Sequence, residues 1–134
     1  MRNFRRFNVW DRAHLFAVAV RRATRNFPRT GYADQKSQLV RAAESIPSNI
    51  VEGCAAATDK EFARYLDIAI KSTAETEYRL QLALDSGVLD GRSWRTLTTE
   101  VVEIRKMLSA LRRTVLSGGG EKKVRALRGT GRSE

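Results

Sequence analysis

The chain has 134 residues, which is enough for one domain with a substantial core but short for two. Its 25 lysines and arginines outnumber its 15 aspartates and glutamates, and its single cysteine, Cys54, excludes an internal disulfide and favours a reducing, cytoplasmic setting. Glycine is sparse before Gly118 and proline occurs only twice, so we expect an all-α protein rather than one built on a sheet.

The first expected helix follows an arginine-rich start and ends before Pro28. Asn8 or Asp11 is expected to cap it. Leu15 and Val18 widen its apolar face, which predicts a second neighbour beyond the bundle core. Its main apolar stripe advances in steps of three and four residues and consists of Trp10, Ala13, Ala17, Val20, Thr24 and Phe27.

The second expected helix runs from an N-cap at Asp34 to a C-cap at Gly53 and continues through Pro47. Proline has no N–H for the carbonyl four residues earlier, and its ring displaces that carbonyl, which costs about 3 kcal/mol unless tertiary contacts compensate. We therefore predict one helix bent at Pro47, with Ser48 and Asn49 satisfying the freed backbone groups. The core positions of this helix are Leu39, Ala43, Ile46 and Ile50.

The third and fourth expected helices have clear start signals. Thr58 and Glu61 have the spacing of a capping box, and Asp90 or Ser93 caps the fourth helix after a glycine-containing turn. The third helix has its core positions at Phe62, Leu66, Ala69, Thr73, Leu80 and Leu84. The fourth has a heptad seam of Trp94, Leu97, Val101, Ile104, Leu108, Leu111 and Val115.

Four helices with short connections predict an antiparallel up-down-up-down four-helix bundle over residues 1–117. Residues 118–134 are basic and glycine-containing, with few apolar side chains, so we expect a flexible basic C-terminal tail there. No apolar run approaches the length of a membrane span, and the charged residues after the N-terminus argue against a signal peptide.

Positive charge is concentrated at the two ends of the chain. Residues 1–30 contain eight arginines against one aspartate, whereas residues 31–117 contain twelve basic and twelve acidic side chains. This asymmetry predicts a polyanionic partner such as the backbone of RNA or DNA, although a role in solubility alone stays open. The candidate nucleic-acid-binding residues are Arg2, Arg5, Arg6, Arg12, Arg21, Arg22, Arg25, Arg29, Arg105, Lys106, Arg112 and Arg113.

Patterns that carry catalysis are missing from the sequence. A di-metal carboxylate site in a bundle needs Glu-x-x-His on two helices, but His14 is the only histidine. No local motif supports a nucleophilic pair of Cys54 and His14, and no glycine-rich phosphate loop occurs. We expect no enzymatic activity, no metal and no cofactor, and we expect the glutamates of the two central helices to pair with arginines.

Three segments resemble one known family: VWDRAHLFAVAVRRATRNFP, QLVRAAESIPSNIVEG and EFARYLDIAIKSTAETEYRLQLAL. The most specific pattern is R-A-x-x-S-I-P-x-N-I-x-E-G, from Arg41 to Gly53. Over residues 4–117 the chain resembles the four-helix-bundle proteins encoded in intervening sequences of bacterial large-subunit ribosomal RNA. The same family includes the accessory variability determinants of diversity-generating retroelements.

The resemblance implies an antiparallel four-helix bundle, assembly as a ring-shaped homopentamer and no enzymatic activity. Retroelement members look like basic barrels that bind a reverse transcriptase and nucleic acid. The first hypothesis is therefore a non-enzymatic, homo-oligomeric nucleic-acid-binding accessory protein with a reverse transcriptase partner. The second is a protein-interaction scaffold of the ribosomal-RNA-associated branch, in which the extra apolar faces mediate assembly.

Overall fold

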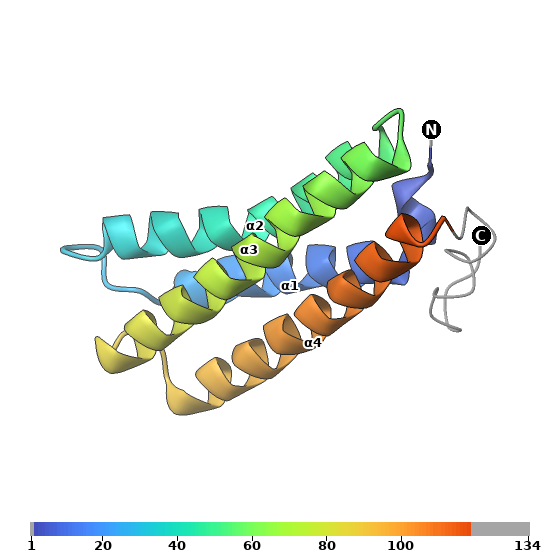
Figure 1. Ribbon diagram of the computed structural model, residues 1–134. Coiled ribbons are helices and arrows are strands. Elements are labelled where there is room, and N and C mark those ends of the chain that lie inside the picture. Colours follow the sequence, from blue (N-terminus) through green and yellow to red (C-terminus); the bar gives the residue numbers. More distant parts are fainter. Residues whose placement is uncertain (1, 119–134) are drawn as a thin grey trace.

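The computed structural model describes residues 2–118 as four antiparallel helices joined by short connections (Figure 1). This range contains no strand, and the predicted all-α four-helix bundle is confirmed. Apart from Gly118, the tail expected over residues 118–134 lies outside the described residues. The elements are a 3-10 turn η1 (Phe4–Arg6) and the helices α1 (Asn8–Thr24), α2 (Ala33–Cys54), α3 (Asp59–Asp85) and α4 (Gly91–Leu116).

One hydrophobic cluster fills the space between the helices. α2 packs against α1 and α3, and α4 packs against α3 and α1, so the four helices enclose a common core. The heptad seam of α4 is buried from Leu97 to Val115, and Trp94 packs against the cluster from its edge. The apolar residues that are spaced three and four positions apart in the sequence thus form the inward face of the helix.

Side-chain caps begin the second pair of helices, as predicted. The hydroxyl oxygen of Thr58 accepts a hydrogen bond of 3.1 Å from the backbone N–H of Glu61. The carboxylate of Asp90 accepts one of 2.8 Å from the N–H of Ser93. Each bond satisfies one of the donors that the first turn of a helix leaves without an intrahelical partner.

The caps predicted for the first pair of helices are wrong. α1 begins after Phe7 and α2 after Tyr32, and neither residue makes a side-chain cap bond. Phe7 is buried, with its ring centroid 5.9 Å from that of Phe62 on α3. The start of α1 is therefore set by tertiary packing of an aromatic ring, which a local capping pattern does not reveal.

Pro47 lies inside α2, which continues from Ala33 to Cys54 as one helix. In Figure 1 the two halves of α2 run at an angle to each other, as the predicted bend requires. Pro47 is buried, and the side chain of Asn49 donates to the carbonyl and the hydroxyl of Ser45 at 2.8 and 2.9 Å. Neither bond reaches the carbonyl of Ala43, which proline leaves without its usual donor, and Ser48 forms no side-chain hydrogen bond within residues 2–118, so the predicted local satisfaction is wrong. Burial of Pro47 in the packed bundle offsets the lost bond instead.

Gly53 is not the C-cap that the sequence suggested, because α2 continues to Cys54. Its role is steric. A Cβ atom at Gly53 would lie 2.7 Å from Cδ1 of Phe62 and 3.0 Å from Cβ of Tyr65, both on α3. Glycine therefore permits the close approach of α2 and α3 at this end of the bundle.

Candidate functional site

Arg2 is part of the packed N-terminal end of the bundle. Its backbone N–H donates to the carbonyl of Cys54 at 3.0 Å, and its guanidinium donates to the carbonyl of Ala56 at 3.2 Å. The same guanidinium forms an ion pair with Asp59 and lies 4.5 Å from the ring centroid of Phe62. We call this group the N-terminal clasp: Arg2, Phe7, Gly53, Asp59 and Phe62. Arg2, predicted as a phosphate contact, thus has structural partners within the fold.

Arg12 and Arg21, two further predicted cations, are also paired within the fold. Arg12 donates two hydrogen bonds to Glu100 on α4, at 2.6 and 3.0 Å. Arg21 donates two to Glu44 on α2, at 2.5 and 3.3 Å. Bonding to Glu100 and Glu44 raises the pKa of the two guanidinium groups above its usual value. Their charges are therefore neutralised by carboxylates in a bidentate arrangement.

Two arginines of α4 form ion pairs with carboxylates of α3, and others on this helix are exposed to solvent. Arg105 forms an ion pair with Glu77 and donates to the hydroxyl of Thr73 at 2.9 Å. The Nε atom of Arg112 lies 2.5 Å from Oδ1 of Asp67, an ion pair without hydrogen-bond geometry. The expected pairing of central glutamates with arginines is confirmed at Glu44, Glu75 and Glu77. Arg79 pairs with Glu75 within α3, whereas the partners of Glu44 and Glu77 come from other helices.

Seven of the twelve predicted cations lie outside the ion pairs described above. Arg5 lies 4.5 Å from the ring centroid of Phe4, and Arg5 and Arg6 both take part in contacts at the N-terminal end. The other five are exposed and form no ion pair with any of residues 2–118: Arg22, Arg25, Arg29, Lys106 and Arg113. The predicted set therefore does not form one site, because the fold uses a large part of it.

A groove between α1 and α4 is lined by an arginine that is absent from the predicted set. It has a volume of about 290 Å³ and is lined by Ala19 and Ala23 on α1 and by Arg92, Ser93, Thr96 and Leu97 on α4. We call it the basic groove. Arg92 and Arg95 went unnoticed because residues 31–117 balance in total charge. Their position in the first two turns of a helix, without a carboxylate three or four residues later, was the available signal.

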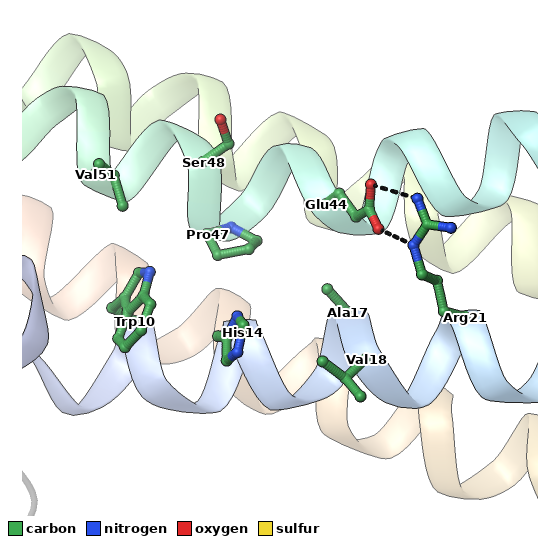
Figure 2. Close-up of a pocket in the computed structure, with 9 residues that line it drawn as sticks. All are labelled: Trp10, His14, Ala17, Val18, Arg21, Glu44, Pro47, Ser48 and Val51. Atoms are coloured by element: carbon green, nitrogen blue, oxygen red, sulfur yellow. Dashed lines mark hydrogen bonds and ion pairs between the residues drawn. The ribbon is translucent and has the colours of Figure 1, made fainter.

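A second groove lies between α1 and α2 and has a different character. Its volume is about 400 Å³, and Figure 2 shows Trp10 and His14 of α1 facing Pro47 and Val51 of α2. The Trp10 and His14 rings are stacked with centroids 5.1 Å apart. The ion pair of Arg21 with Glu44 closes one end. We call it the apolar groove, lined by Trp10, His14, Ala17, Val18, Arg21, Glu44, Pro47, Ser48 and Val51.

The two side chains considered for catalysis, Cys54 and His14, lie in different surroundings, one buried and one on a groove. Cys54 is 1% exposed, and burial raises the pKa of its thiol to about 12, so it is protonated at neutral pH. His14 lies on the apolar groove against Trp10. Within residues 2–118 no three His, Cys, Asp or Glu side chains gather closely enough to hold a metal ion.

None of the helices in the described part of the chain combines the length and apolar character needed to cross a bilayer.

Comparison with known proteins gives one family and a similar fold. A family model described as 23S rRNA-intervening sequence protein matches residues 5–110. A crystal structure of a protein of unknown function from the S23 ribosomal protein family of Bacteroides thetaiotaomicron is 28% identical, with a TM-score of 0.71. That match covers 79% of this chain and 99% of the other. No curated protein matches the chain.

Proposed function

The chain belongs to the 23S rRNA-intervening sequence protein family, and from this premise we propose that it is a non-enzymatic interaction module that assembles with copies of itself. The apolar groove carries this proposal. A groove of about 400 Å³ with Trp10, Pro47 and Val51 on its walls is the size and chemistry of a surface that receives apolar side chains. Leu15, adjacent to His14 and 59% exposed, extends the apolar area along α1.

Charge supports a second copy of the chain as the occupant of this groove. Copies that each carry a net charge of +10 repel one another, and contact at a surface without net charge adds the least to that repulsion. The apolar groove is such a surface, because Arg21 and Glu44, the only oppositely charged residues that line it, are paired with each other. The family resemblance extends the proposal to a ring of five copies.

Light scattering of the purified chain tests this assembly. Ser48 is exposed and lines the groove, so Ser48→Arg places a cation in it without disturbing the core. Ala74→Arg, at an exposed position on α3, adds the same charge elsewhere and is the matched control. We expect an oligomer for the unmodified chain and for Ala74→Arg, and a smaller species for Ser48→Arg. A monomeric unmodified chain contradicts the proposal.

A second candidate function is binding to the phosphate backbone of a nucleic acid. The observation that favours it is the exposure of Arg22, Arg25 and Arg29, which form no ion pair with any of residues 2–118. Such binding depends strongly on salt, and a protein with about 6–10 phosphate contacts loses about 10³–10⁵-fold in affinity between 50 and 200 mM salt. Fluorescence anisotropy with labelled RNA and DNA tests it, and absence of binding at low salt rejects it.

The resemblance to retroelement members adds a finer form of this candidate, in which the chain accompanies a reverse transcriptase. Its support is the combination of a four-helix bundle with exposed arginines, which also characterises those relatives. A reverse transcriptase gene beside the gene of this chain, followed by co-purification of the two products, is the appropriate test. Co-expression without association rejects the partnership while leaving self-assembly unaffected.

A further inference from the structure

The basic groove has one wall of small side chains and one of polar side chains. Ala19 and Ala23 leave room on the α1 side, and Arg92 and Thr96 supply a guanidinium and a hydroxyl on the α4 side. The hydroxyl of Ser93, which also lines the groove, donates to Asp90. With about 290 Å³ it is near the lower end of the size range of ligand pockets. A narrow groove of this kind accepts a single strand more readily than the broad surface of a duplex.

One arginine lines the groove, and two more follow lining residues by one helical turn. Arg92 lines it, Arg95 follows one turn later on α4, and Arg22 follows Ala19 by one turn on α1. All three are exposed and form no ion pair with any of residues 2–118. Because arginines with no carboxylate partner repel one another, a bound anion is stabilised among them.

α1 and α4 also contain an arginine whose charge is offset by a carboxylate. About two turns beyond Arg92 on α4, Glu100 accepts two hydrogen bonds from Arg12 of α1. At the basic groove the nearest counterpart along α4 is Asp90, whose carboxylate accepts from the N–H and the hydroxyl of Ser93. Those bonds lower the pKa of Asp90, so it contributes one negative charge against three arginines.

We propose that the basic groove holds the phosphodiester backbone of a single nucleic-acid strand, with Arg22, Arg92 and Arg95 contacting phosphates and Thr96 donating from its hydroxyl. Guanidinium groups suit this task because their planar forks bind phosphate oxygens in pairs. The inference rests on the second candidate function and gives it a location. Arg92 and Arg95 thereby join the binding residues. The five arginines that are paired with carboxylates leave them: Arg2, Arg12, Arg21, Arg105 and Arg112.

The test compares two double variants that lose the same charge. Arg92→Gln with Arg95→Gln removes two groove cations, whereas Arg41→Gln with Lys71→Gln removes two exposed cations of α2 and α3 that form no ion pair within residues 2–118. Anisotropy of a labelled single strand, as RNA and as DNA of the same sequence, is measured between about 50 and 200 mM salt. Circular dichroism confirms that every variant is folded.

We expect the groove variant to bind at least tenfold more weakly at low salt, with equal loss for RNA and DNA. Its slope of log affinity against log salt falls by about 1.4, because each phosphate contact on a single strand contributes about 0.7. The α2 and α3 variant retains the slope of the unmodified chain. Thr96→Glu, which places a carboxylate in the groove, loses affinity at least as strongly as the double groove variant.

Two outcomes overturn the inference, and they differ. Equal weakening by both double variants means that net charge alone governs binding, so the groove has no special role while nucleic-acid binding itself stands. Failure of the unmodified chain to bind any strand at low salt rejects the second candidate function and the groove assignment together.

Discussion

The two ends of this bundle use arginine in opposite ways. At the N-terminal clasp, Arg2 meets two backbone carbonyls, the carboxylate of Asp59 and the face of Phe62. At the other end, where α1 finishes and α4 starts, Arg22, Arg92 and Arg95 face solvent around the basic groove without an ion pair in the described part of the chain. Arg2 closes the fold at the first end, whereas Arg22, Arg92 and Arg95 leave positive charge available at the second.

The presence of an acidic partner, rather than the number of arginines, decides what an arginine of this bundle does. When a carboxylate and backbone carbonyls bind a guanidinium, they offset its electrostatic attraction for phosphate. An exposed guanidinium contributes little to stability and keeps its long-range attraction for polyanions. We therefore expect variants at the clasp to change stability and variants at the basic groove to change binding.

The largest expected effect is the difference in the reactivity of Cys54 between the folded and the denatured chain. The backbone carbonyl of Cys54 accepts a hydrogen bond from the N–H of Arg2 at the clasp. Burial raises the pKa of its thiol from 9.0 to about 12, which lowers the thiolate fraction at pH 8 by about a thousandfold. Alkylation by iodoacetamide should be slower by at least this factor in the folded chain than in denaturant. Mass spectrometry follows the reaction, and rapid labelling of the folded chain would show that the clasp opens frequently.

The next effect is the loss of stability in Gly53→Ala. The new methyl group would lie 2.7 Å from Cδ1 of Phe62, so α2 and α3 must separate or the ring must shift, at a cost of about 1–3 kcal/mol. Gly91→Ala, at the start of α4, is the control because no atom beyond its chain neighbours and its own helix backbone lies within 4 Å of the added methyl group. Urea unfolding compares the two variants, and equal stability would mean that the clasp is loosely packed.

Arg2→Gln should have a smaller effect on stability. It removes the ion pair with Asp59, the bond to the carbonyl of Ala56 and the contact with Phe62, all partly open to solvent. We expect a loss of about 1 kcal/mol in the free energy of unfolding. The same urea titration measures it, and an unchanged midpoint would remove the distinction between this arginine and those of the basic groove.

The smallest expected change is the stability of Arg92→Gln with Arg95→Gln. Both side chains are exposed and form no ion pair within residues 2–118, so the free energy of unfolding should change by less than about 0.5 kcal/mol. Thermal unfolding followed by circular dichroism checks this. A large destabilisation would place these arginines among the structural ones.

The fold was predictable from the sequence where local signals and burial agree. The heptad seam of α4 and the caps at Thr58 and Asp90 each depend on residues a few positions apart, and all of them are present in the structure. The starts of α1 and α2 were mispredicted because no side chain caps them. Gly53 was mispredicted because its role depends on Phe62 of another helix.

The candidate site was less predictable because ion pairs form between distant parts of the chain. Arg12 and Glu100 are separated by 88 positions, and Arg2 and Asp59 by 57. No local pattern joins such pairs, so counting arginines overestimated the available charge near the N-terminus and overlooked Arg92. Only the arrangement of the helices separates arginines that are paired from those that remain exposed.

The most direct test of this division is the affinity of Arg2→Gln and of Arg92→Gln for the same labelled single strand at low salt. Both variants lose one positive charge, so a difference between them reports position alone. The account predicts that Arg2→Gln binds like the unmodified chain after correction for its folded fraction, while Arg92→Gln binds several-fold more weakly. Equal affinities of the two variants would contradict it.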